Sequence, residues 1–433
     1  MSTKVVPVMS RRFFPVLCIM GFFAILSSTM SKSPVLPSFA ESLGTPEYLL
    51  GFVASASTIP GIIASLPAGS LSDRQGRGKV ILLAGVIFAT APFLYLLVVN
   101  PYQLILVRFY HGFATAILVP VANAAIVERF PESRGQRVST FSSSTAVGRA
   151  IAPALGGYIL LVTVSNYHEL YIIVGIAGAL ALFMATGLRE KRETVEGLDA
   201  EAPTDGGTLG KAASKSGRGS VRDWGEVASD GRVVAGGLVE AAQYYTYGAF
   251  EFYLVGYALS LNPPVDSFLV GIILAAAIVT LVIGKPIMGG VSDRIGRRRP
   301  IVLGLVLGGV SMIAVQFATS FFQLVVVSVT YGLGFSLVTS STPPLVSELV
   351  RKEVYGSAMG FLGTIMDVGQ VLGPIVTGFI LAAGFGYSGS FTSLGILLLS
   401  AALLFSVWLK RSHSRDDRGT SSSESLSGGI PRG

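Results

Sequence analysis

The sequence predicts an all-α integral membrane fold with twelve transmembrane helices in two pseudo-symmetric six-helix bundles. Only 13% of the 433 residues are charged and 51% are hydrophobic, whereas a soluble protein carries roughly 25% charged residues. The chain also repeats itself internally, as shown below. Apolar runs of about 20 residues, the length that crosses a bilayer, are centred near twelve positions: Ile25, Ala56, Phe88, Leu118, Gly148, Gly178, Tyr245, Ala277, Val310, Val329, Val368 and Leu399.

The basic residues are distributed asymmetrically along these runs. Of the 32 Lys and Arg residues, four lie within spans. The other 28 precede the first span, follow an even-numbered span or follow the last one. This positive-inside pattern predicts a multi-pass protein of the plasma membrane with both termini cytoplasmic. Topology therefore accounts for the net charge of +7, and we expect no nucleic-acid partner.

The distribution of polar residues predicts four segments. Residues 1–190 form an N-terminal six-helix bundle and residues 233–410 a C-terminal one. Between them, residues 191–232 are rich in Gly, Ser and mixed charge, which is typical of a flexible cytoplasmic linker. Residues 411–433 are rich in Ser, Gly and Arg and are predicted to be a disordered cytoplasmic tail.

Catalytic and metal chemistry are not indicated. Cys18 is the only cysteine, and the three histidines lack metal-binding spacing. No set of a nucleophile and a base is recognisable. We therefore expect no enzyme activity, no cofactor and no metal site, and we expect a monomer in the lipid bilayer.

The two halves of the chain repeat one another. Asp73, in the loop between the second and third spans, has a counterpart in Asp293, at an offset of 220 residues. Duplicated halves are characteristic of secondary transporters, whose substrate site lies at the interface of the halves near the membrane midplane. The same offset relates Gly69 to Gly289, Arg74 to Arg294, Gly76 to Gly296, Arg77 to Arg297, Gly112 to Gly332 and Glu128 to Glu348.

The loop after the second span resembles the G-x-L-a-D-r-x-G-r-k loop of the major facilitator superfamily. The matching residues are Gly69, Leu71, Asp73, Arg74, Gly76 and Arg77, with Asp293, Arg294, Gly296 and Arg297 in the second half. The resemblance covers essentially the whole membrane-embedded chain and implies the major facilitator fold. It also implies that Asp73 faces a neighbouring helix N-terminus, where negative charge is favoured, and that this contact breaks when the access state changes. The alternative is a charged turn that only obeys topology.

The fourth span resembles the R-x-x-q-G pattern of the same family. Arg108 and Gly112 match it, and His111 replaces the usual Gln. The resemblance implies a part for Arg108 in proton coupling, whereas a structural ion pair is the alternative. His111 can titrate near neutral pH, but a packing role is its alternative.

The fifth span resembles the G-x-x-x-G-P-x-x-G-G pattern of twelve-span proton-coupled multidrug exporters. Gly148, Pro153, Gly156 and Gly157 match, and Ala152 replaces the second Gly. Small residues at this spacing permit close helix packing, and the proline bends the helix. The resemblance implies an exporter, and ordinary packing of a repeated helix is the alternative.

Three carboxyl groups lie within the spans. Burial favours the neutral form of a carboxyl group, which suits it to exchange protons. Glu240 and Asp367 are the first candidates for proton coupling, and Glu251 is the third. The alternative is that the carboxylates form static ion pairs with Arg108 and Arg149.

Further polar residues are candidates for the substrate pathway. Arg149 lies near mid-depth of the fifth span, and Lys32 lies in the outer part of the first span, as an outer gate or a contact for an anionic group. Tyrosine hydroxyls and rings can hold planar or amphipathic ligands. The candidate residues are Arg149, Gln243, Tyr244, Tyr247, His111 and Lys32.

The favoured hypothesis is a secondary active transporter that exports small amphipathic or drug-like molecules in exchange for protons. The transported molecule, protons and the bilayer are then its partners. The alternative is an importer or exchanger of a sugar or an organic anion, because four cations and three carboxylates lie within the spans.

Overall fold

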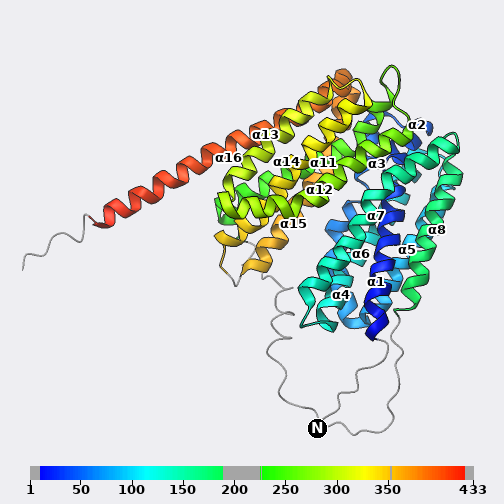
Figure 1. Ribbon diagram of the computed structural model, residues 1–433, viewed down its shortest axis with the longest axis horizontal. Helices are drawn as coiled ribbons and strands as arrows, with labels where there is room; N and C mark the ends of the chain where they lie inside the picture. Colours follow the sequence, from blue (N-terminus) through cyan, green and yellow to red (C-terminus); the bar gives the residue numbers. More distant parts are fainter. Residues whose placement is uncertain (1–9, 189–224, 226, 352–353, 425–433) are drawn as a thin grey trace, which may run out of the picture.

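The computed structural model describes residues 10–188, 225, 227–351 and 354–424, and within these residues it contains helices and no strand (Figure 1). The first half comprises α1 (Ser10–Met30), α2 (Val35–Ser42), α3 (Glu47–Ser55), α4 (Ile59–Gln75), α5 (Arg77–Tyr95), α6 (Pro101–Arg129), α7 (Arg134–Val162) and α8 (Tyr167–Thr186). The second half comprises α11 (Gly231–Leu259), α12 (Ser267–Ile295), α13 (Arg298–Val315), α14 (Phe321–Leu349), α15 (Tyr355–Ile380), the short π-helix η2 (Leu381–Phe385) and α16 (Gly386–Glu424).

The helices form two bundles with the same packing order. In the first bundle α1 packs on α7 and α8, and α6 packs on α4 and α5. In the second bundle α11 packs on α15 and α16, and α14 packs on α12 and α13. Each contact of one bundle therefore has its equivalent in the other, and the predicted fold of two pseudo-symmetric bundles is confirmed.

Ten helical stretches of the described chain are long and apolar enough to cross a membrane. The last stretch, Tyr355–Val407, contains α15 and most of α16, so it accounts for two of the predicted spans. α11 is absent from the ten because its centre carries Glu240, Gln243 and several tyrosines. Nevertheless 19 of its 29 residues are buried, so protein rather than lipid surrounds this helix.

The second predicted span is not one helix. It divides into α3 and α4 at residues 56–58, close to its centre. Pro60 follows this break, and proline lacks the N–H group that would continue the helical hydrogen bonding. A backbone group that lacks its helical hydrogen bond is stable at membrane depth only where protein or a polar cavity surrounds it. The break therefore marks a place where polar groups are accommodated inside the fold.

The two ends of the molecule differ. We call the end with the α4–α5 and α12–α13 loops the motif end, and the end with residues 96–100 and 260–266 the turn end. Short segments at the turn end connect α5 to α6 and α11 to α12. The connection from α15 to α16 is tighter, because the chain reverses through η2 immediately before α16.

The bundles contact each other at the turn end, through α7 with α12 and through α3 with α15. A Cβ atom at Gly157 would lie 2.2 Å from the carbonyl oxygen of Ser267, and one at Gly51 would lie 2.3 Å from that of Pro374. These backbone approaches require glycine. In Figure 1 the bundles meet near α2 and α3 and spread apart toward the end where α4 finishes. The interface is therefore closed at the turn end.

The structure describes only parts of the predicted linker and of the predicted tail. α16 continues to Glu424, inside the range 411–433 for which the sequence predicts a disordered tail. No proline occurs between residues 387 and 424 to end this helix. Most of the linker predicted at residues 191–232 lies outside the described residues.

Candidate functional site

A cavity of about 490 Å³ lies between the two bundles, on the motif-end side of their contacts. Both bundles line it, because α1, α4, α6 and α7 come from one half and α11 and α15 from the other. The lining residues are Ile25, Ser28, Thr29, Lys32, Ser57, Thr58, Gly61, Ser65, Thr115, Ala116, Val119, Pro120, Asn123, Arg149, Tyr247, Glu251, Asp367 and Gln370.

An ion pair between the bundles bounds the cavity toward the turn end. The Nζ atom of Lys32, just after α1, donates to Oε2 of Glu251 on α11 at 2.6 Å. The side chain of Glu251 is only 7% exposed and that of Lys32 20%, so the contact is weakly screened by solvent. The pair ties the two halves together where the interface closes.

Two further charged residues line the cavity without an ion-pair partner. Arg149 on α7 is an exposed residue, and Asp367 on α15 is partly exposed. In the described part of the chain, neither residue forms an ion pair within 4.0 Å. Opposite charges therefore face the cavity from opposite bundles without neutralising each other by contact.

Arg108 lies behind the cavity wall rather than on it. Its side chain is buried, and Nη2 donates to the hydroxyl of Ser57 at 2.6 Å. Its Nε atom has no hydrogen-bond partner. Gly112, one turn further along α6, permits the approach because a Cβ atom there would lie 2.3 Å from the carbonyl oxygen of Ser57. Arg108 therefore holds the α3–α4 break, which presents Ser57 and Thr58 to the cavity.

The structure separates the predicted pathway residues into two groups. Arg149, Tyr247 and Lys32 line the cavity together with two of the coupling candidates, Glu251 and Asp367. The remaining predicted residues lie outside this lining: Glu240, Gln243, Tyr244, His111 and Arg108.

The residues outside the lining are packed within their own bundles. His111 contacts the rings of Phe88 and Tyr95 edge-on, which is the packing alternative considered for it. Tyr244 packs on Tyr247 and on Phe335. The amide group of Gln243 is fully buried and has no hydrogen-bond partner.

Glu240 is also interior to its bundle. Its carboxyl group is buried, Oε2 has no hydrogen-bond partner, and the nearest compensating charge is Lys285 on α12. The two groups are not within 4.0 Å of each other. Lys285 itself is partly buried. The static pairs of carboxylates with Arg108 and Arg149 are likewise not formed.

Sequence reasoning missed the uncharged polar residues of the cavity. Three features of the sequence could have indicated these residues. They are a proline close to the centre of the second span, an asparagine in an apolar helix and hydroxyl residues near the end of the first span. The missed residues are Ser28, Thr29, Ser57, Thr58, Thr115, Asn123 and Gln370.

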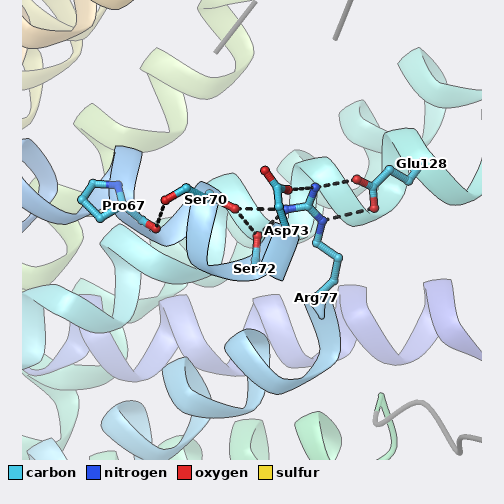
Figure 2. A network of polar contacts seen from close by, with 7 residues as sticks. Pro67, Ser70, Ser72, Asp73, Arg77 and Glu128 are labelled. Atoms are coloured by element: carbon cyan, nitrogen blue, oxygen red, sulfur yellow. Dashed lines mark hydrogen bonds and ion pairs between the residues drawn. The ribbon is translucent and has the colours of Figure 1, made fainter. Parts of the chain in front are cut away.

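The duplicated loops at the motif end form the same ion-pair arrangement twice. Figure 2 shows the Arg77 guanidinium between Asp73 and Glu128. The N···O distance is 2.5 Å to each carboxylate. The hydroxyl of Ser72 also accepts from Arg77. The 220-residue repeat that includes Glu128 is therefore explained, because each half uses the Glu at this position to hold its loop arginine.

The second loop repeats this geometry. Arg297 pairs with Asp293 and donates from Nε to Oε1 of Glu348 at 3.0 Å. Gly76 and Gly296 are the C-caps of α4 and α12, with φ of +94° and +84°, which an L side chain rarely adopts. Arg74 and Arg294 are exposed.

The Asp73 side chain is 62% exposed, and its partner belongs to its own bundle. Among the described residues, no ion pair or hydrogen bond joins Asp73 to the N-terminus of a helix in the other bundle, which is the contact that the resemblance implies.

The fifth-span motif serves two different contacts. A Cβ atom at Gly148 would lie 2.7 Å from the carbonyl oxygen of Phe22, so this glycine packs α7 on α1. Gly156 likewise faces Met30. Gly157 and Pro153 instead face α12 of the other bundle, where Gly271 approaches the carbonyl oxygen of Pro153. The motif therefore packs the helix within its bundle and closes the turn end.

The described residues contain no group of three or more His, Cys, Asp or Glu side chains that could hold a metal ion.

Comparisons with known proteins agree with this architecture. The sequence profile of the Major Facilitator Superfamily matches residues 17–265 and 238–430. This family match shows that the protein is a membrane transporter and not an enzyme. The chain belongs to the Major Facilitator Superfamily.

Two relatives have names that refer to multidrug resistance or efflux. The multidrug resistance protein MdtG of Dickeya zeae is 26% identical over 393 residues, covering 88% of this chain and 91% of the relative. The multi-drug resistance efflux pump PmrA homolog of Lactococcus lactis is 23% identical over 365 residues, covering 82% and 85%.

Solved structures with other transport names share the fold. A bacterial homolog of the human lysosomal transporter Spinster, in an inward-facing and occupied conformation, has a TM-score of 0.75 at 15% identity and covers 93% of this chain and 97% of its own. The nucleoside transporter NupG has a TM-score of 0.73 at 16% identity, covering 92% and 99%. At these identities the similarity shows the fold alone.

Proposed function

We propose that this protein exports small amphipathic molecules in exchange for protons by alternating access. The observation that supports this most directly is the cavity between two equivalent bundles, which the Lys32–Glu251 pair bounds at one end. A site between two rocking bundles can face either side of the membrane in turn. Ligands and protons that prefer one state shift the equilibrium between the states.

The distribution of basic residues supports the sidedness of this proposal. Arg74, Arg77, Arg294 and Arg297 all lie at the motif end. By the positive-inside rule this end is cytoplasmic. The cavity lies on the cytoplasmic side of the closed contacts, which is where an exporter takes up its cargo.

Asp367 and Glu251 are the coupling residues that the geometry favours. Both line the cavity, so both can exchange protons with the side to which the cavity opens. Protonation of Glu251 would remove its attraction to Lys32 and release the closed end. In this proposal Arg108 positions Ser57. Glu240 takes part in proton coupling from its buried position inside the second bundle.

Efflux of drug-like molecules is supported by the names of MdtG and PmrA, relatives that match more than four fifths of the chain. Import or exchange of a sugar or an organic anion is the second candidate. It is favoured by the many hydroxyl and amide groups of the cavity and by the cation Arg149.

A growth screen followed by a vesicle assay tests the proposal. Expression in a bacterium without its main efflux pumps should protect it from some members of a panel of anionic, neutral and cationic antibacterial compounds. In proteoliposomes, uptake of a protective compound should depend on an imposed pH gradient.

Asp367→Asn should lower gradient-driven accumulation of that compound at least tenfold while downhill exchange persists. Asp266→Asn is the matched control, because Asp266 caps α12 and asparagine caps a helix equally well. The proposal is wrong if wild-type transport is equal with and without the gradient, or if Asp367→Asn and Glu251→Gln both retain full coupling.

A further inference from the structure

We infer that the transported molecule carries an anionic group, a carboxylate or a phosphate, that binds Arg149. This inference rests on the proposed function and specifies the substrate class of the same cavity. It follows from the charges that line the cavity, from the depth of Arg149 and from the character of the remaining lining residues.

The charges of the cavity do not balance by contact. Lys32 and Glu251 neutralise each other at 2.6 Å. The remaining charged residues of the lining are Arg149 and Asp367, and no ion pair within 4.0 Å joins them. Each of these two side chains is therefore available to a ligand in the cavity.

Arg149 cannot become neutral by losing a proton. An aspartate at membrane depth can become neutral by binding a proton, whereas an arginine stays protonated in proteins. Arg149 lies at the middle of α7, between Arg134 at the motif end and Val162 at the turn end. A charge at this depth is costly unless it faces water or a partner. An anionic group of the cargo supplies such a partner during transport.

The geometry of arginine favours this class of ligand. A guanidinium group binds a carboxylate or phosphate through two parallel hydrogen bonds. Ser28 and Thr29 on α1, with Asn123 on α6 and Gln370 on α15, offer hydrogen bonds to the rest of the molecule.

The cavity offers a lipophilic cation few aromatic rings and carboxylates to bind. Tyr247 is the one aromatic residue among the lining residues, and cation binding typically uses several aromatic faces. Asp367 is the one carboxylate of the lining that no cation neutralises. The lining therefore suits a polar anion better than an apolar cation.

Two xanthene dyes test the inference, because they share a scaffold and differ in charge. The full chain in phosphatidylcholine nanodiscs is titrated into carboxyfluorescein, an anion, or rhodamine 6G, a cation, and fluorescence anisotropy reports binding. Wild-type protein should bind carboxyfluorescein. Arg149→Gln should weaken this binding about tenfold or more, as expected for the loss of a charged hydrogen-bonding partner.

Three further variants separate recognition from general effects. Arg149→Lys keeps the charge but not the paired donors, so its loss should be smaller than that of Arg149→Gln. Asp367→Asn removes a negative charge that repels an anionic ligand and should therefore strengthen carboxyfluorescein binding. Arg299→Gln, which removes an exposed cation outside the cavity, is the matched control and should bind as wild type.

The inference is overturned if wild-type protein binds only rhodamine 6G or neither dye, or if Arg149→Gln binds carboxyfluorescein within twofold of wild type. Separate results would contradict this inference and the proposed function. Gradient-driven transport of rhodamine 6G without carboxyfluorescein binding would remove the inference alone. Arg149-dependent transport of carboxyfluorescein that ignores the pH gradient would remove proton coupling alone.

Discussion

Loss of the Lys32–Glu251 ion pair should open the turn end of the molecule. Glu251→Gln keeps the size of the side chain and removes the negative charge. The pair joins the two bundles at 2.6 Å, and both side chains are largely shielded from solvent. A hydrogen bond to a charged group contributes about 1.5–3 kcal/mol. Because about 1.4 kcal/mol corresponds to a tenfold change, the ratio of open to closed molecules should rise about 10- to 100-fold.

Spin-label distances across the turn end measure this change. Tyr102 and Phe322 occupy equivalent positions at the starts of α6 and α14, and both are exposed, at 67% and 77%. Cys18 is the single native cysteine, so Cys18→Ala provides a background for labelling Tyr102→Cys and Phe322→Cys. Glu251→Gln should add a population at a longer distance to the distribution of the parent protein.

A control on the same helix makes the result specific. Asp230→Asn removes an ion pair with Arg232 at the start of α11 but keeps an N-cap side chain. Its distance distribution should match that of the parent. The reasoning is refuted if Glu251→Gln and Lys32→Met both leave the distribution unchanged, because the ion pair would then contribute nothing to closure.

The glycines provide two further predictions. Gly157→Ala should also populate the longer spin-label distance, because its Cβ atom would lie 2.2 Å from the carbonyl oxygen of Ser267. Gly363→Ala, with no atom within 4 Å of its Cβ position, is the control, and equal distributions for the two variants would contradict the packing argument. Gly76→Ala should cost about 1–3 kcal/mol of stability because φ is +94° there. Thermal unfolding in detergent measures this cost against Gly69→Ala, which has no clash, and an equal midpoint for both variants would refute it.

The fold could be predicted from the sequence in most respects, because the membrane restricts what a chain can do. A spanning segment must satisfy its own backbone hydrogen bonds, so apolar runs of this length form helices. The helical spans and the duplication both follow from patterns along the chain. The run centred near Tyr245 predicts α11, although the polar centre of this helix keeps it outside a simple hydropathy criterion.

The residues that line the cavity could not be predicted in the same way. Glu240, Gln243 and Tyr247 share one region of α11, yet only Tyr247 reaches the cavity. Which residues face the other bundle depends on helix rotation and on where glycine allows two backbones to approach. Neither quantity is encoded in the spacing of residues within one helix.

Sequence alone thus determined that this protein spans the membrane with two equivalent halves, since hydropathy and repetition are properties of the chain itself. The tertiary structure decided that Lys32 pairs with Glu251, that Arg108 supports Ser57, and that Arg149 faces the cavity without an ion-pair partner. These relations join helices far apart in the sequence, and only the packing of the two bundles brings them together.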